Sequence, residues 1–130
     1  MAVTLIYAGA LALWFLILSL RVIAARIGPS GPGLGDGGNP KVLRRIRGHA
    51  NFAEYVPLVL LMMGFLELSG LPRWWLHAMG AALLVGRLIH GYALSFTQEY
   101  VFGRTAGIIL TLIPLLVGAG LCLYKGFIGL

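Results

Sequence analysis

Four long apolar segments constrain the fold of this 130-residue chain more than any other feature. Each approaches or exceeds the roughly 20 residues that an α-helix needs to cross a bilayer. Residues 28–40 are rich in Gly and Pro and indicate a flexible loop, whereas the other links are short. Because short links favour antiparallel neighbours, the sequence predicts an all-α membrane protein with a single four-transmembrane-helix bundle domain over residues 1–130. We expect the spans at residues 3–25, 41–69, 73–96 and 104–125.

The balance of apolar and charged residues argues against two other classes of protein. Apolar residues make up 59% of the chain and charged residues 11%, which is too apolar for a soluble domain of this size. The net charge of +6 does not indicate nucleic-acid binding, because the basic residues lie mostly at the ends of the apolar segments. The single cysteine, Cys122, offers no disulfide partner and no metal-ligand spacing. We therefore expect neither a nucleic-acid partner nor a metal.

The distribution of Lys and Arg predicts the orientation of the chain. Arg87 lies inside the third span, and Arg73 and Lys125 lie on one side of the membrane. The other seven basic residues lie on the opposite side, namely Arg21, Arg26, Lys41, Arg44, Arg45, Arg47 and Arg104. By the positive-inside rule, loop 28–40 is cytoplasmic and both termini are on the non-cytoplasmic side. Glu67, near the non-cytoplasmic end of the second span, is expected to be solvated or paired with Arg73.

A polar stripe follows one face of the second span near its cytoplasmic end. An α-helix turns by about 100° per residue, and five polar side chains of this span fall within an arc of about 100°. They are Arg44, Arg47, Asn51, Glu54 and Tyr55. Glu54 is expected to lie several ångströms below the cytoplasmic surface of the hydrocarbon, where a carboxylate is costly without a partner.

The third span carries charged or titratable residues at a similar depth. Arg87 lies about 21 Å from Arg73 along the helix axis, which is also the depth of Glu54. His90 lies one turn nearer the cytoplasm. The sequence therefore predicts a Glu54–Arg87 ion pair. One interpretation is purely structural, with Asn51 and His90 as hydrogen-bonding groups that hold the bundle together.

A second interpretation is a binding site for an anion. Four arginines, Arg26, Arg44, Arg47 and Arg104, gather at the end of the bundle that holds the one carboxylate of Glu54. Guanidinium groups suit carboxylates and phosphates as partners. Glu54 would then bind the amino group of the ligand. This pattern fits a small zwitterion with more than one carboxylate.

Four short motifs, spread over nearly the whole chain, combine arginines with other polar residues. They are RVIAAR at residues 21–26, RRIRGHANFAEYVPL at 44–58, VGRLIH at 85–90 and the pair Arg104–Thr105. Together they resemble the MAPEG family, membrane-associated proteins in eicosanoid and glutathione metabolism, and indicate a bacterial-type member. The resemblance implies a MAPEG-like homotrimer of four-helix bundles in the bacterial inner membrane. Glutathione would bind as co-substrate between neighbouring subunits, near the cytoplasmic face.

The resemblance also implies roles for the polar residues. Arg104 would be the catalytic residue that stabilises the glutathione thiolate, and Thr105, also a glutathione contact, stands where some members have a serine. The other implied glutathione contacts are Arg26, Arg44, Arg47, Asn51, Glu54, Tyr55, Arg87 and His90. One departure is Leu94, because several relatives carry a tyrosine at that place. Tyr92 lies about 160° away around an ideal helix and is expected to pack against lipid or a neighbouring helix.

These roles imply a glutathione transferase or peroxidase that acts on lipophilic electrophiles or lipid hydroperoxides. A guanidinium near the sulfur favours the nucleophilic thiolate, so that no protein nucleophile is needed. The second substrate would be lipophilic and would enter from the membrane lipid. An alternative is a non-catalytic protein on the same scaffold that binds a lipid or a partner. A proton-coupled exporter is disfavoured because residues 3–20 of the first span contain no carboxylate.

Overall fold

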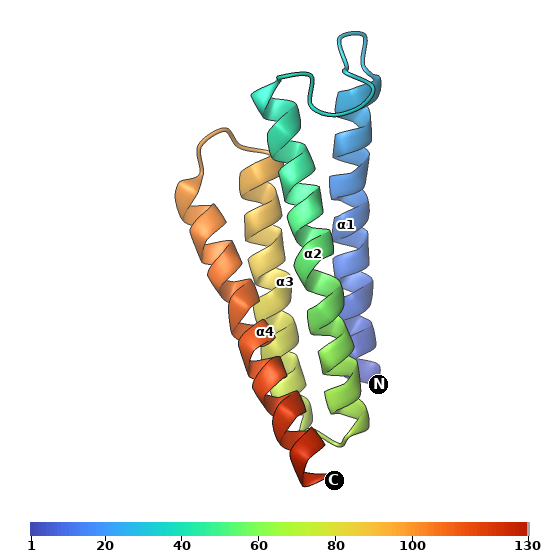
Figure 1. Cartoon of the computed structure of the whole chain (residues 1–130), viewed down its shortest axis with the longest axis vertical. Helices are drawn as coiled ribbons and strands as arrows, with labels where there is room; N and C mark the ends of the chain where they lie inside the picture. Colours follow the sequence, from blue (N-terminus) through green and yellow to red (C-terminus); the bar gives the residue numbers. More distant parts are fainter. Residues whose placement is uncertain (130) are drawn as a thin grey trace.

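The computed structural model describes residues 1–129, which form four long α-helices joined by loops (Figure 1). The helices are α1 Ala2–Ile27, α2 Pro40–Leu68, α3 Arg73–Ser95 and α4 Val101–Ile128. Each of them is long and apolar enough to cross a membrane. The predicted all-α, four-span architecture is therefore confirmed.

The observed helix bounds differ most from the predicted spans at the two ends of α4, which is three residues longer at each end. This helix begins at Val101 rather than at residue 104. No proline interrupts residues 101–103, and the Arg104 amide donates to the Tyr100 carbonyl at 3.1 Å, which closes the first turn. Arg104 thus lies at the end of that turn instead of at the first position of the helix.

The predicted loop between α1 and α2 is present over residues 28–39. Gly37 and Gly38 have φ of 60° and 73°, a region that glycine enters readily because it has no Cβ. The loop ends at Asn39, whose side chain accepts a hydrogen bond from the Lys41 amide at 2.9 Å and caps α2. Pro40 fills the first helical position, where a missing N–H costs nothing.

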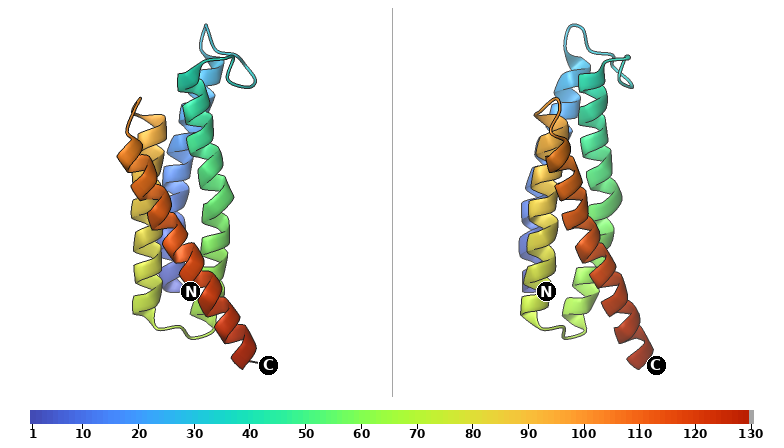
Figure 2. Two further views of the ribbon diagram at one scale, coloured as in Figure 1. Left: turned by 60° about the vertical axis from the view of Figure 1, so that its left-hand side comes forward. Right: turned by 90° about the vertical axis from the view of Figure 1, so that its left-hand side faces the viewer.

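The helices form an antiparallel bundle with α2 and α3 at its centre. α1 packs against α2 and α3, α4 packs against α3 and α2, and no contact joins α1 to α4 within the described chain. Figure 2 shows α4 crossing the bundle obliquely, with its first turns beside α3 and its last turns near α2. We call the end with residues 28–39 and 96–100 the loop end. α1 begins and α4 ends at the opposite end (Figure 1).

Glycines let α3 approach both flanking helices closely. At the α3–α4 contact, a Cβ on Gly86 would lie 2.9 Å from the Gly107 carbonyl oxygen, and a Cβ on Gly107 would lie 2.6 Å from His90 Cβ. At the α1–α3 contact, a Cβ on Gly91 would lie 2.7 Å from Trp14 Nε1. Small residues at crossings are typical of membrane bundles, because lipid gives helices little hydrophobic reason to associate. The contact at Gly107 places α4 directly against His90.

The apolar core occupies the middle of the bundle and extends toward the opposite end. Its most buried side chains come from the three helices α1, α2 and α3, and include Leu11, Leu18, Val59, Met63, Leu66, Leu76 and Leu83. Toward the loop end, the buried face of α3 changes from apolar residues to Arg87, His90 and Ser95. The buried polar side chains of α3 therefore lie in the half of the bundle nearer the loop end.

Glu67 joins α2 to the first turn of α1 at the opposite end. Its carboxylate accepts hydrogen bonds from the amides of Val3 and Thr4, both at 2.9 Å, and from the Thr4 hydroxyl at 2.6 Å. The expectation that Glu67 is solvated or paired with Arg73 is therefore wrong. The amides at a helix N-terminus have no partners within the helix, and a carboxylate satisfies them well.

Candidate functional site

A cavity of about 350 Å³ lies at the loop end among α2, α3 and α4. Its volume falls in the range of about 300–1,000 Å³ that small-molecule sites occupy. Five of its seven lining residues are polar side chains singled out from the sequence. The lining consists of Leu43, Arg44, Arg47, Asn51, His90, Leu94 and Arg104. The fold thus brings together predicted site residues from three helices, and we call this cavity the arginine cavity.

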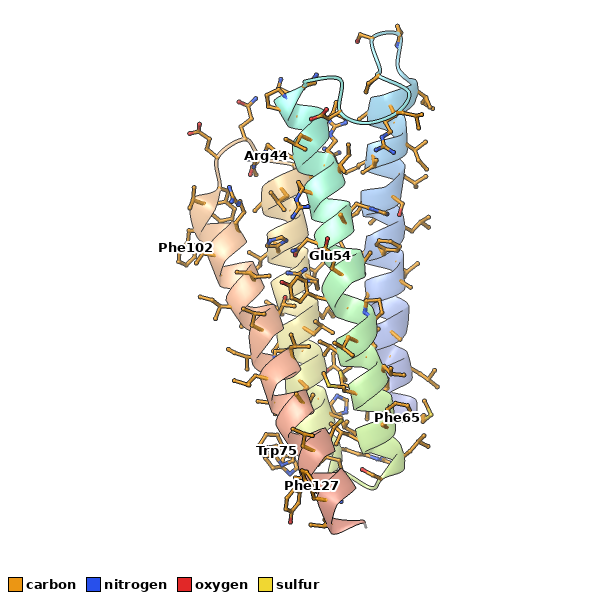
Figure 3. All side chains as sticks on the ribbon, in the orientation of Figure 1. Arg44, Glu54, Phe65, Trp75, Phe102 and Phe127 are labelled. Carbon is orange, nitrogen blue, oxygen red and sulfur yellow. The ribbon has the colours of Figure 1, made fainter. Side chains whose placement is uncertain are left out.

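Helical periodicity explains how α2 contributes to this cavity. Arg44, Arg47 and Asn51 are spaced by three and four residues and therefore share one face of the helix. Figure 3 shows Arg44 near the loop end of α2, with Glu54 further along the same helix. Arg44 donates to the carbonyl oxygens of Ala93 at 2.8 Å and Thr97 at 3.1 Å, which ties α2 to the end of α3.

His90 and Arg104 complete the lining from α3 and α4. His90 is 7% exposed and packs against Gly107, whereas Arg104 is exposed and lies about one turn nearer the loop end than Gly107. Arg87 precedes His90 by three residues on α3, and Arg104 lines the same cavity from α4. Cations from two helices therefore flank the imidazole.

Arg87 lies behind the cavity and donates a hydrogen bond to Asn51. Its guanidinium is 1% exposed, and Nη1 donates to Asn51 Oδ1 at 2.8 Å. Arginine has donors only, so Asn51 must present its oxygen to Arg87. The NH₂ group of Asn51 is then free to donate elsewhere. Within residues 1–129, Arg87 Nε and Nη2 are buried and have no hydrogen-bond partner.

The predicted Glu54–Arg87 ion pair is wrong. Glu54 is exposed on α2, whereas Arg87 is buried and bonded to Asn51. The depth of the two residues was compatible with a pair. The positions of the side chains around the helix exclude the pair. Glu54 lies about 60° around α2 from Asn51, the residue that contacts Arg87, and is at the outer edge of the stripe.

Five of the ten predicted site residues do not line the arginine cavity of a single chain. Arg26 donates from Nε to the Gly35 carbonyl in the loop at 3.2 Å. Tyr55 is half-buried on α2, and Thr105 is exposed on α4. Glu54, as described, is exposed. Arg87, which is buried behind Asn51, is the fifth residue outside the lining.

Leu94 occupies the wall of the cavity, and Tyr92 does not. The Tyr92 ring is 51% exposed and stacks on Phe96, with ring centroids 5.5 Å apart. It lines a separate apolar hollow on the surface with Trp14 and Tyr100. Sequence reasoning missed Trp14, whose indole donates to the Arg87 carbonyl at 3.0 Å. Because α1 is apolar around its whole circumference near Trp14, its sequence does not show whether Trp14 faces the lipid or the bundle.

The electrostatics of the cavity favour an anion. Its wall contains three guanidinium groups and no carboxylate, and the Asn51 amide adds neutral donors. The described residues contain no cluster of three His, Cys, Asp or Glu side chains that would hold a metal ion. Guanidinium forks and amide donors bind carboxylates strongly.

Comparison with known proteins identifies the family. The model of the MAPEG family matches residues 4–124. The chain belongs to the MAPEG family. All ten site residues predicted from the sequence lie within the matched range.

Two curated relatives of this MAPEG protein come from Escherichia coli. Both are described as inner membrane protein YecN, one from strain K12 and the other from O6:H1 strain CFT073. Each is 43% identical to this chain over 58 residues, which is 45% of this chain and 44% of the relative. The alignment thus spans less than half the length of these relatives. No solved structure matches the chain.

Proposed function

We propose that this MAPEG protein is a membrane-bound glutathione transferase or peroxidase that acts on lipophilic electrophiles or lipid hydroperoxides. The observation that carries the proposal is the arginine cavity. It has three guanidinium groups, one amide and one imidazole, with no carboxylate in its wall. Glutathione has two carboxylates and a thiol that can ionise, and these anionic groups match the donors of the cavity.

The residues of the cavity suit the separate groups of glutathione. Arg44 and Arg47 would pair with carboxylates, and the NH₂ of Asn51 would donate to a carbonyl or carboxylate oxygen. Arg104 would lie near the sulfur, where its charge favours the thiolate. Glu54 would pair with the ammonium group. The bound thiolate would form a bond from sulfur to the electrophilic carbon, while the leaving group takes the bonding electron pair.

Exposed charges on the single chain support a homotrimer. Arg47, Glu54 and Arg104 are exposed. A charged side chain at the centre of a span costs about 2.5–3.5 kcal/mol in lipid. Because Glu54 lies within the apolar part of α2, the surface that carries it needs a cover. A neighbouring subunit would provide that cover and would bring its own Arg26 to the site. The glutathione site would then lie between subunits.

The membrane location follows the same reasoning. The Escherichia coli relatives are described as inner membrane proteins, and we propose the same membrane for this chain. Seven of its ten basic residues lie toward the loop end. The positive-inside rule then places the loop end and the arginine cavity at the cytoplasmic face, with both termini on the other side.

The decisive experiment measures glutathione binding and turnover with the same purified protein. Isothermal titration calorimetry in detergent should give saturable glutathione binding, and Arg47→Ala should weaken it about tenfold or more, because it removes a charge-assisted contact. Arg73→Ala removes a charge at the opposite end and serves as the control. A chromogenic aryl halide should yield a glutathione conjugate. Absence of glutathione binding by the wild-type protein would refute the proposal.

Leu94 favours a second candidate, a non-catalytic binding protein on the same scaffold. Its aliphatic side chain lies in the cavity wall, at the place where the resemblance predicts a tyrosine hydroxyl. Without this hydroxyl, the cavity could still bind glutathione as an anion, but it would lack one group that could stabilise the glutathione thiolate. Saturable glutathione binding without conjugation or peroxide reduction, over a panel of lipophilic substrates, would support this candidate.

A further inference from the structure

A second basic cavity lies at the loop end, on the other side of Arg44. It has a volume of about 150 Å³ and opens above the end of α3, between α1 and α2. Four cationic side chains, Arg21, Lys41, Arg44 and Arg45, line it together with residues 94–98. None of the four forms a salt bridge with an acidic residue of the described chain, where the only such bridge involves Glu67. We call it the interfacial cavity.

Two of these cations have structural roles that leave part of each guanidinium unused. Arg21 donates to the Ser95 carbonyl and lies over the Phe96 ring, with its guanidinium carbon 3.7 Å from the ring centroid. Arg44 donates to the carbonyls of Ala93 and Thr97. Both therefore complement the negative end of the α3 dipole. Within residues 1–129, the Nε atoms of Arg21 and Arg44 are nevertheless buried without a partner.

The other two cations have no structural role at this place. No side-chain hydrogen bond of Lys41 or Arg45 is found within residues 1–129, and the charge of Arg45 repels that of Arg21. Satisfying the last carbonyls of α3 needs only Arg21 and Arg44. Convergence of Lys41 and Arg45 on the same cavity raises the electrostatic cost of the bundle unless an anion neutralises them.

The depth of the cavity corresponds to the phosphate level of a bilayer. α3 has 23 residues and is about 34 Å long, close to the hydrocarbon thickness of about 30 Å, so its end at Ser95 lies near the membrane surface. α2 has 29 residues and extends further, to about 43 Å. Figure 1 shows α1 and α2 rising above the end of α3. The interfacial cavity lies above the end of α3, where α1 and α2 extend further than α3.

We propose that the interfacial cavity binds the phosphate group of an anionic membrane phospholipid. A phosphodiester offers acceptor oxygens to the Arg and Lys side chains, while its acyl chains extend down the apolar outer surface of α1 and α3. A soluble phosphate compound carries the same chemistry and is the alternative source of the anion. This site shares Arg44 with the arginine cavity, but the proposal does not rest on the proposed glutathione binding.

The test uses the full-length protein in nanodiscs with equal amounts of phosphatidylglycerol and phosphatidylcholine. Native mass spectrometry after release should show retained phosphatidylglycerol in preference to phosphatidylcholine. The double variant Lys41→Gln, Arg45→Gln should lower that preference by roughly 30-fold, because each interfacial cation contributes about fivefold. Neither side chain has a hydrogen bond to lose, so the fold should persist, which circular dichroism checks.

The matched control removes charge at the opposite end of the bundle. Arg73→Gln should retain the wild-type preference for phosphatidylglycerol. A second arm follows inorganic phosphate by ³¹P NMR in phosphatidylcholine nanodiscs. Phosphate binding that is lost in the double variant, without any preference for phosphatidylglycerol, would reject the lipid and assign the site to a soluble phosphate. Equal lipid retention by wild type and the double variant, with no phosphate binding, would overturn the proposal entirely.

Discussion

At the scale of single residues, Asn51 connects the buried interior to the candidate site. Its oxygen accepts from Arg87 at 2.8 Å, and its NH₂ group remains for a ligand. Arg87 has no carboxylate partner within residues 1–129, so Asn51 supplies the strongest acceptor that the guanidinium has there. Asn51 therefore both stabilises the bundle, through Arg87, and directs an NH₂ donor into the cavity.

The first prediction concerns this contact. Asn51→Ala should lower the free energy of unfolding by about 1–3 kcal/mol, because it removes the side-chain acceptor of a buried guanidinium. Unfolding by sodium dodecyl sulfate, followed by circular dichroism, measures the change. Asn51→Asp keeps an oxygen at the same place and should retain at least wild-type stability. Equal unfolding of Asn51→Ala and wild type would contradict this account of Arg87.

The second prediction concerns the thiolate. A nearby cation stabilises the charged form of a thiol, so the pKa of bound glutathione should fall below the value of about 8.5 for a free thiol. Arg104→Ala should return that pKa toward 8.5 and lower the thiolate absorbance at pH 7, whereas Arg104→Lys should retain part of the signal. Ultraviolet difference spectra over pH 6–9 test this. An unchanged titration in Arg104→Ala would remove Arg104 from the mechanism.

The residue pattern on α2 was predictable from the sequence, but its pairing with α3 was not. The spacing of Arg44, Arg47 and Asn51 places them on one face through the period of the helix alone. The choice of Asn51 over Glu54 as partner of Arg87 depends on how α2 and α3 are rotated about their axes. That rotation is determined by the packing of α2 against α3, which cannot be read from the sequence of either helix alone.

At the scale of the helices, small residues determine where α4 lies. Gly86 and Gly107 bring α3 and α4 into backbone contact, and this contact seats His90 against α4. Arg104 extends from the same helix about one turn away. The distance between His90 and Arg104 across the cavity therefore depends on glycines outside it.

The third prediction tests this packing with matched glycines. Gly86→Ala should destabilise the bundle by about 1–3 kcal/mol, because the new Cβ would lie 2.9 Å from a backbone oxygen that cannot rotate away. Gly120→Ala in α4 meets no atom within 4 Å and should be neutral or slightly stabilising. The midpoint of unfolding in sodium dodecyl sulfate distinguishes them. Equal midpoints would show that the α3–α4 contact tolerates a methyl group.

The fourth prediction concerns the cap that Glu67 provides to α1. Glu67→Ala should cost about 0.5–2 kcal/mol of stability, the usual effect of removing an N-terminal cap. Glu99→Ala removes an exposed carboxylate that has no hydrogen bond among residues 1–129, and serves as control. Hydrogen exchange at Val3 and Thr4 should accelerate in Glu67→Ala and stay unchanged in Glu99→Ala. Unchanged exchange in both variants would contradict the cap.

The four helices could be predicted from the sequence because length and apolar content decide whether a segment spans a bilayer. The predicted ends of the helices were less accurate. α4 begins at Val101 rather than at residue 104, since the prediction took the charge of Arg104 as the boundary, whereas the backbone forms a helix before it. The cap by Glu67 was missed because it joins α2 to α1, whose relative position only the assembled bundle defines.

At the scale of the whole molecule, one chain leaves its charged site uncovered. Arg47, Glu54 and Arg104 are exposed on a bundle whose surroundings are lipid over most of its length. If the proposed homotrimer covers this surface, native mass spectrometry of the protein released from detergent should give a mass of three chains of 14.0 kDa each. A monomer at concentrations that saturate with glutathione would contradict a site formed between subunits.

Arg44 belongs to the walls of both cavities, and this has a thermodynamic consequence. If an anionic lipid and glutathione bind as proposed, they share one cation, and each reduces the attraction that Arg44 offers the other. Linkage makes the effect reciprocal: the factor by which the lipid weakens glutathione binding equals the factor by which glutathione weakens lipid binding. The charge of the surrounding membrane would thus set the affinity for a soluble metabolite.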